Sequence, residues 1–321
     1  MTRRCEIEGL FPEYLRKMFS ISCEYLQGLQ EIRLRVNQPV ILNINNYEFF
    51  LSEKGTVHKE KSKGFILLKK DLNAILSHIC KYSIYAFEDE IKQGYLTVEG
   101  GHRIGLTGQV VLENECIKTI KNISFMNIRV SHEIVGVSDH IIPNLYSKHK
   151  FLNTLIISPP GAGKTTLLRD LIRNISDGTK YASGVNVGVV DERSEIGGSY
   201  LGTVWNNLGM RTDLLDACPK ALGMIMLIRS MSPVIIAVDE LGSLEDIKAL
   251  HQIIQCGCSI VATIHGESLE EVREKEFLSS ILKDKVFERY VVLSKKDKVG
   301  TVQGIYNKDF LWEPNIISQE G

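Results

Sequence analysis

The sequence lacks any paired Cys-x-x-Cys motif, although it contains seven cysteines among its 321 residues. Cysteines scattered in this way predict reduced thiols rather than a disulfide framework or a zinc site. There is no recognisable N-terminal signal sequence, so we expect a cytoplasmic protein. No apolar run approaches the roughly 20 residues that cross a bilayer, and any association with a membrane is therefore expected to be peripheral.

An excess of charge of either sign is also missing. The formal net charge is −1, from 38 lysines and arginines against 39 aspartates and glutamates. This near balance argues against a surface built to coat nucleic acid, and no stripe of basic and aromatic residues stands out. Nucleic acid is therefore not expected as a partner. The length is sufficient for two domains.

The most informative segment that is present predicts a phosphate-binding loop of the Walker A type, directly after an apolar run at residues 154–157. It consists of Ser158, Pro159, Pro160, Gly161, Ala162, Gly163, Lys164, Thr165 and Thr166. Between a strand and a helix, the N–H groups of such a loop turn inward around the phosphates of a nucleotide. We expect Lys164 to neutralise phosphate oxygens and the Thr165 hydroxyl to bind Mg²⁺. The strict motif has a glycine where Ser158 stands, a departure that the two later glycines make tolerable.

Residues 1–148 predict a smaller α+β domain with an antiparallel sheet. A helical pattern covers residues 71–80, and alternating or short apolar runs predict strands at residues 31–36, 39–44, 94–98 and 102–111. The polar residues 147–150 precede the apolar run of the phosphate loop. We therefore expect the domain boundary between residues 148 and 149.

Residues 149–321 predict a second domain in which strands alternate with helices. Continuous apolar runs predict strands at residues 154–157, 186–191, 234–239, 259–264 and 286–293. Such runs suit a sheet that is covered on both faces, which is mostly parallel and doubly wound. Ligands bind such sheets at the carboxyl ends of the strands, so polar residues at those ends are the candidate site residues.

Two acidic residues, Asp239 and Glu240, end the strand expected at residues 234–239. A carboxylate at the end of a buried strand needs a partner, and beside a phosphate loop we expect Asp239 to hold Mg²⁺. Glu240 could then orient and deprotonate the attacking water. The alternative is that both residues cap a helix that starts at Ser243.

Other polar residues end the neighbouring strands. Asp191, Glu192 and Glu195 follow the strand expected at residues 186–191, where they could equally form a surface turn. His265 follows the strand expected at residues 259–264; it could sense the γ-phosphate or simply be a solvated side chain. Their position beside the other strand ends favours a role at the nucleotide.

The order of these elements resembles the secretion-ATPase branch of RecA-like motor proteins. Residues 190–195 resemble the acidic box of that family, and residues 257–265 resemble its histidine box, with Cys258 in place of the usual histidine. The resemblance implies a RecA-like P-loop NTPase core that hydrolyses ATP with Mg²⁺ by in-line attack of water. In this interpretation Glu240 activates the water, Glu192 and Glu195 assist near the γ-phosphate, and His265 relays the nucleotide state.

A narrower resemblance, to the family of stage III sporulation protein AA, covers almost the whole chain. It is carried by residues 31–36, 100–105, 127–130, 190–195, 209–213, 218–220 and 228–233. It implies an ATP-hydrolysing motor of an export channel between mother cell and forespore, peripherally attached on the mother-cell side and partnered by integral-membrane subunits. It also implies a homo-hexamer with ATP held between subunits. An arginine of a neighbouring copy or of the N-terminal domain is then expected at the γ-phosphate; Arg211 is the first candidate, before Arg103, Arg129 and Arg229.

Two other classes of function share these motifs. A RecA-like nucleic-acid-dependent ATPase or loader has the same core, although the charge balance argues against it. A nucleotide-binding scaffold without turnover would also keep the phosphate loop. Stimulation of ATP hydrolysis by DNA would favour the first alternative, and a complete lack of hydrolysis would favour the second.

Overall fold

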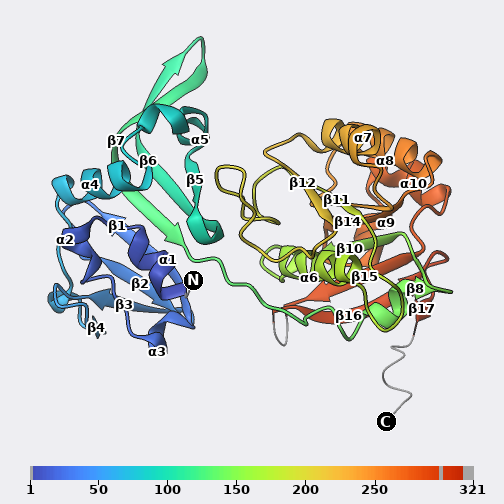
Figure 1. Ribbon diagram of the computed structural model, residues 1–321, viewed down its shortest axis with the longest axis horizontal. Coiled ribbons are helices and arrows are strands. Elements are labelled where there is room, and N and C mark those ends of the chain that lie inside the picture. The colour runs from blue at the N-terminus through green and yellow to red at the C-terminus, as the bar shows by residue number, and fades with distance from the viewer. Residues whose placement is uncertain (1–2, 296–298, 314–321) are drawn as a thin grey trace. The chain divides into compact units, whose positions relative to one another are not determined.

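A computed structural model describes residues 3–295 and 299–313 and divides the chain into two compact units (Figure 1). The first unit contains Met1–His132 and Gly198–Trp205, and the second contains Glu133–Gly197 and Asn206–Gly321. The boundary expected after residue 148 falls inside the second unit. Ile141, Ile142 and Leu145 are buried in the core of that unit, which is why the chain changes units earlier than the polar residues 147–150 indicate.

The first unit is an antiparallel sheet with helices, as expected for its α+β class. The strand order is β4-β3-β2-β1-β7-β6-β5. The strands are β1 (Leu29–Arg35), β2 (Ile41–Ile44), β3 (Tyr47–Leu51), β4 (Val57–His58), β5 (Tyr95–Val98), β6 (His102–Glu113) and β7 (Cys116–Arg129). The helices are α1 (Arg3–Gly9), α2 (Glu13–Arg16), α3 (Cys23–Leu26), α4 (Lys69–Ile79) and α5 (Glu88–Gln93). The four strands and the helix expected here are confirmed, whereas β3, β4 and β7, the last of which pairs with both β1 and β6, were not predicted.

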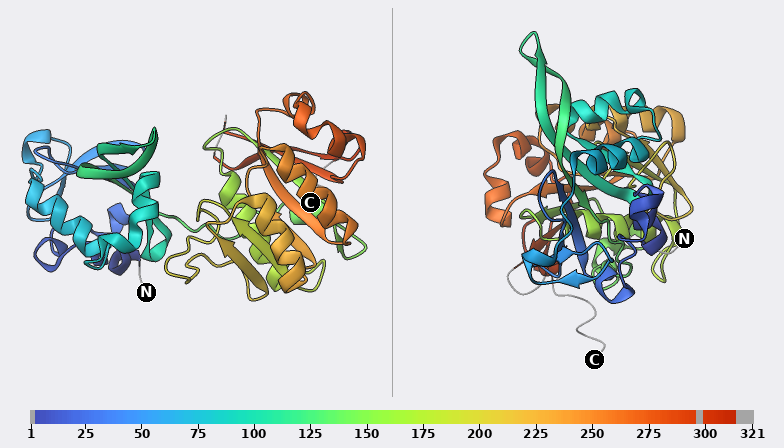
Figure 2. Two further views of the ribbon diagram at one scale, coloured as in Figure 1. Left: turned by 90° about the horizontal axis from the view of Figure 1, so that it is seen from above. Right: turned by 90° about the vertical axis from the view of Figure 1, so that its left-hand side faces the viewer.

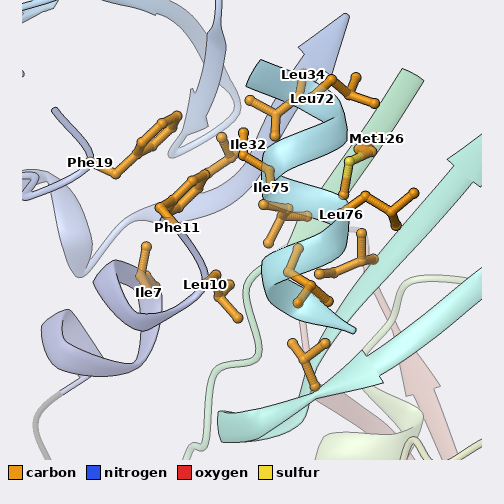
Figure 3. Packing of buried hydrophobic residues seen from close by; sticks show 14 of the residues in the cluster. Ile7, Leu10, Phe11, Phe19, Ile32, Leu34, Leu72, Ile75, Leu76 and Met126 are labelled. Atoms are coloured by element: carbon orange, nitrogen blue, oxygen red, sulfur yellow. The ribbon is translucent and has the colours of Figure 1, made fainter. Parts of the chain in front are cut away.

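Alternating side chains explain how the sheet and α4 share one core. Ile32 and Leu34 of β1 are fully buried on the face that meets Leu72 and Ile75 of α4, and Figure 3 shows these side chains pointing toward one another. Helix α4 begins two residues before the expected start. The Asp71 carboxylate accepts the N–H of Leu68 at 3.1 Å, so it caps the helix from inside its first turn.

The second unit is built on an eight-stranded sheet of order β12-β11-β13-β14-β10-β15-β16-β17. Its strands are β10 (Thr154–Ser158), β11 (Val187–Asp191), β12 (Thr212–Asp216), β13 (Ile235–Val238), β14 (Ser259–His265), β15 (Arg289–Ser294), β16 (Thr301–Asn307) and β17 (Trp312–Glu313). The strands from β12 to β15 pair in parallel, whereas β16 and β17 pair antiparallel. The five expected strands are confirmed, and the three others lie toward the edges of the sheet.

Helices cover both faces of this sheet (Figure 1 and Figure 2). They are α6 (Lys164–Asp177), α7 (Lys220–Met231), α8 (Leu244–Gln255), α9 (Leu269–Arg273) and α10 (Ser279–Lys283). Leu155 and Ile157 of β10 pack in the layer with α7 and α8, while Ile156 packs in the layer with α6. Burial on both faces explains the uninterrupted apolar runs of the parallel strands.

The polar segment at which the domain boundary was expected forms a hairpin of the second unit. It consists of β8 (Tyr146–Ser147) and β9 (Lys150–Phe151), and the rings of Tyr146 and Phe151 meet edge to face at 5.4 Å. In the described part of the chain, no helix combines the length and the apolar character that crossing a bilayer requires.

Candidate active site

The loop between β10 and α6 has the backbone geometry of a phosphate-binding loop. Gly161 and Gly163 take positive φ angles of 71° and 87°, a region that favours glycine. The N–H of Gly300 donates to the carbonyl of Ala162 at 3.0 Å, and a Cβ on Gly163 would approach the Cα of Gly300 to 3.4 Å. Gly300, the residue before β16, therefore holds the loop from one side.

A cavity of about 480 Å³ opens over this loop and brings together five segments that are separated in the sequence. Its lining consists of Ser158, Pro159, Pro160, Gly161, Gly163, Lys164, Thr165, Thr166, Glu195, Glu240, His265 and Val299. Eight of the nine expected nucleotide-binding residues are among them; the ninth, Ala162, is buried beneath the loop. The expected convergence of Lys164, Glu240 and His265 is thus present in the structure.

Lys164 is the cation that compensates the two acidic residues after β13. Its Nζ lies 3.1 Å from Oε2 of Glu240 and 3.3 Å from Oδ1 of Asp239. Glu240 has a φ of 42°, an unusual left-handed conformation for a residue other than glycine. The turn that this conformation makes directs the Glu240 carboxylate toward the phosphate loop.

A buried threonine, Thr263 of β14, fixes the turn after β13. Its hydroxyl donates to Oδ1 of Asp239 at 2.5 Å and accepts the N–H of Glu240 at 2.8 Å. The Thr165 hydroxyl donates to the other carboxylate oxygen of Asp239 at 3.2 Å. Thr165 and Asp239 therefore present neighbouring oxygen atoms beside the cavity, and oxygen ligands of this kind fit the expected Mg²⁺.

The alternative role for Asp239 and Glu240, as caps of the following helix, is wrong. The cap of α8 is formed by Ser243 and Asp246: the N–H of Asp246 donates to the Ser243 hydroxyl, and the Asp246 carboxylate accepts the N–H of Ser243, each at 3.1 Å. Asp239 and Glu240 are thus left to face Lys164.

His265 ends β14 directly beside the end of β10, where it pairs in register with Ser158. Its side chain is exposed and lines the cavity. This location allows contact with a bound nucleotide, and a role in relaying the nucleotide state remains a prediction.

The two expected glutamates of the acidic box occupy different places. Glu195 lines the phosphate cavity and also an adjoining pocket of about 160 Å³, while Glu192 lines only the adjoining pocket. Glu192 forms an ion pair with Lys220, the first residue of α7. Glu195 therefore lies closer to the phosphate loop than Glu192 does.

Asp191, which was expected near the nucleotide, and Arg169, which the sequence analysis did not select, hold the acidic box in place. The buried carboxylate of Asp191 accepts the N–H groups of Glu195, Ile196 and Gly197 at 2.9, 2.9 and 2.8 Å. Burial nevertheless raises its pKa to about 6, because loss of water outweighs these donors.

Arg169 of α6 donates to the carbonyls of Glu195 and Ile196 at 2.8 and 3.0 Å, and burial lowers the pKa of its guanidinium. Its position four residues after Thr165 on the helix was the only sequence signal for this contact.

Arg211 has a structural contact that the sequence analysis did not anticipate. Its guanidinium donates to the carbonyl of Ser176 at 2.9 Å, in the last turn of α6. Because α6 has 14 residues and therefore spans roughly 20 Å, Arg211 and Lys164 of one chain lie at opposite ends of this helix. Arg211 thus has a structural contact within its own chain, and its action on the site of a neighbouring copy remains a prediction.

Comparison with known sequences shows similarity along almost the whole chain. Residues 1–310 match the family model described as "Sporulation stage III, protein AA". The chain is 41% identical over 305 residues to "Stage III sporulation protein AA" of Bacillus subtilis (strain 168), and the match covers 95% of each chain.

Comparison with solved structures shows the fold. The chain is similar to the pilus retraction motor PilT with bound ADP, with a TM-score of 0.55, 13% identity, and coverage of 84% of this chain and 75% of that one. It is also similar to the ATPase DotB of Legionella pneumophila, with a TM-score of 0.52, 16% identity, and coverage of 82% and 72%. The expected fold class, a RecA-like core preceded by a smaller α+β domain, is confirmed.

Proposed function

Because this chain belongs to the sporulation stage III protein AA family, we propose that it hydrolyses ATP as the motor of an export complex between mother cell and forespore. The observation that carries this proposal is the single cavity shared by the phosphate loop, Glu240, Glu195 and His265. An anion-binding loop that faces carboxylates across one cavity suits hydrolysis of a phosphate anhydride better than binding alone.

The chemistry follows from the contacts of Lys164. The triphosphate competes with Asp239 and Glu240 for the Lys164 ammonium, so that binding releases the Glu240 carboxylate. Glu240 then accepts a proton from the attacking water, and Glu195 contributes from the lining of the same cavity. Thr165 and Asp239 would hold Mg²⁺, which when bound supplies positive charge to the phosphate oxygens. Positioning and electrostatics provide most of the catalysis in reactions of this type.

The charges around the cavity favour an oligomer. Among the described residues that line it, Lys164 is the only lysine and there is no arginine, while Glu195 and Glu240 add negative charge. Mg²⁺ would offset part of the charge of a bound triphosphate, and an arginine of a neighbouring copy can offset more. We propose a homo-hexamer that is attached peripherally to the membrane on the mother-cell side and acts on integral-membrane subunits.

A test compares ATP hydrolysis by the purified chain with that of Lys164→Ala and Lys248→Ala, in the presence and absence of Mg²⁺. Lys248 is an exposed lysine on α8, so its replacement controls for the loss of one charge. We expect Lys164→Ala to lose at least a hundredfold in turnover and Lys248→Ala to keep the wild-type rate. Turnover by Lys164→Ala at the wild-type rate would refute the assigned site.

Glu240→Gln separates binding from hydrolysis. This variant keeps the size of the side chain but cannot accept the proton, so we expect it to bind ATP and hydrolyse it slowly. Normal turnover would point to Glu195 or Glu192 as the base instead. Each assay includes DNA as an additive, because stimulation by DNA would favour the nucleic-acid-dependent class of ATPase over an export motor.

A further inference from the structure

One segment of the chain leaves the acidic box, joins the first unit and returns to the second. This segment, residues 198–205, is called the strap below; it follows Gly197 and precedes Asn206, both of which belong to the second unit. Only eight residues separate these two ends. The strap begins three residues after Glu195, whose side chain lines the phosphate cavity.

The base of the strap is fastened within the second unit. Asn206 donates its N–H to the carbonyl of Gly197 at 3.0 Å and its side-chain amide to the carbonyl of Ile196 at 2.8 Å. The same Ile196 carbonyl accepts a hydrogen bond from Arg169 of α6, the helix that begins at the phosphate loop. Any movement of α6 would therefore reach the two ends of the strap through Ile196 and Asn206.

The tip of the strap is fastened within the first unit. Tyr200 is 8% exposed and belongs to the core of that unit, where its ring stacks on Phe87 at 6.3 Å. The ammonium of Lys81 lies 5.1 Å from the centre of the same ring. Trp205, at the other end of the strap, packs against this core as well.

The chain between the cavity and this anchor is short. Five peptide units separate Glu195 from Tyr200, a path of at most about 17 Å when fully extended. Asn206 ties the two ends of the strap together in the second unit, and Tyr200 fixes its tip in the core of the first unit. A displacement of Glu195 is therefore passed on through a short covalent path to the residue that anchors the strap.

We propose that the strap transmits occupancy of the phosphate cavity to the first unit, with Tyr200 as its anchor and Arg169 and Asn206 as positioning residues at its base. The proposal rests on the proposed function in one respect, which is that a nucleotide fills the cavity. It assigns a specific route for coupling between nucleotide state and the N-terminal part of the chain, and it gives a role to a segment outside the conventional ATPase motifs.

The strap contains a tryptophan, Trp205, whose fluorescence can report on its surroundings. The sequence has two tryptophans, Trp205 and Trp312, so Trp312→Phe leaves Trp205 as the only one. Trp205 is not among the residues that line the phosphate cavity. In this full-length background, we expect the magnesium complex of a non-hydrolysable ATP analogue to change the Trp205 emission, with a midpoint equal to the calorimetric Kd.

Two further substitutions in the same background test the anchor. Tyr200→Ala removes the buried ring, whereas Leu201→Ala removes a neighbouring side chain that is 68% exposed. We expect Tyr200→Ala to reduce the emission change by more than half while the calorimetric Kd stays within threefold, and Leu201→Ala to behave as the background does. An equal emission change in both variants, or binding of the analogue without any change at Trp205, would overturn the proposed role of the strap and leave the proposed function intact. Failure of the analogue to bind by calorimetry would overturn the proposed function as well.

Amide hydrogen exchange of the wild-type chain tests the proposal independently if Tyr200→Ala does not fold. We expect the analogue to slow exchange in residues 198–205 and around Phe87, in addition to the phosphate loop. Slower exchange confined to the phosphate loop and acidic box would contradict the proposal without depending on any variant.

Discussion

At the scale of single residues, Thr263 shows how one hydroxyl organises the acidic end of β13. It has no exposed surface, and it satisfies both a carboxylate oxygen of Asp239 and the N–H of Glu240. The left-handed backbone of Glu240 is costly, and the hydrogen bond from its N–H to Thr263 is one of the contacts that keep it in place. The geometry of the expected metal ligand Asp239 and of the expected base Glu240 thus depends on a third residue on the neighbouring strand.

Replacement of Thr263 by valine tests this dependence. Valine has nearly the same shape but leaves the Asp239 oxygen and the Glu240 N–H without their partner, so we expect a loss of about 1–3 kcal/mol in the free energy of unfolding. We also expect slower ATP hydrolysis, because Asp239 and Glu240 lose their fixed positions. Denaturant titration and an ATPase assay measure the two effects. Thr263→Ser keeps the hydroxyl and should preserve activity; equal losses in both variants would mean that packing, not hydrogen bonding, is at work.

At the scale of elements, the sequence predicts best where side-chain pattern and burial coincide. The parallel strands β10, β11, β13 and β14 are continuous apolar runs because helices cover both faces of the sheet. Strand β12 was not predicted, because it is an edge strand with an aspartate near each end and no fully buried residue. The phosphate loop was predictable because its residues are adjacent in sequence. By contrast, the hydrogen bonds with which Arg169 and Asp191 hold the acidic box form only when α6 and β11 come together in the folded chain.

The buried carboxyl of Asp191 at the end of β11 leads to a prediction about pH. Burial raises its pKa to about 6, above the ordinary value near 3.9, and the neighbouring charges are those of Asp216 and Arg169. Since the folded state binds the proton more tightly than the unfolded state, protonation stabilises the fold below about pH 4, and this contribution is lost as the pH rises through about 6.

The comparison variant is Asp191→Asn, which cannot titrate. We expect the free energy of unfolding of the wild type, relative to this variant, to fall by roughly 3 kcal/mol between about pH 4 and about pH 7. Denaturant titrations at several pH values give the difference, in which the contributions of other titrating groups largely cancel. A difference that does not change with pH would show that Asp191 stays ionised, held by its three N–H donors.

At the scale of the whole molecule, the division into units depends on contacts that no local sequence pattern predicts. The expected boundary followed the polar residues 147–150, but the preceding segment is already tied to the second unit: the Asp170 carboxylate accepts the N–H groups of Gly136 and Ser138. The burial of Tyr200 in the first unit, more than 60 residues after the main boundary, is equally non-local. Two domains and their classes were therefore predictable, whereas their exact composition was not.

The lack of an arginine among the described residues that line the phosphate cavity leads to a prediction about assembly. If an arginine of a neighbouring copy completes each site, turnover per chain should rise with chain concentration as copies associate. Among the alanine variants of Arg103, Arg129, Arg211 and Arg229, the one that removes this arginine should lose turnover while remaining folded. For Arg211, the contact with Ser176 means that lost stability has to be separated from lost catalysis.

Mixing two inactive variants identifies that arginine. When the inactive arginine variant is mixed in equal amounts with Lys164→Ala, about a quarter of the interfaces in a head-to-tail ring join an intact lysine to an intact arginine, so up to about a quarter of the wild-type activity should return. The matched control mixes Lys164→Ala with Glu240→Gln. Lys164 and Glu240 of one chain contact each other in the same cavity, so every site in that mixture carries a defect and no activity should return. Recovery in the control, or failure of every arginine variant to recover with Lys164→Ala, would contradict a site shared between neighbouring copies.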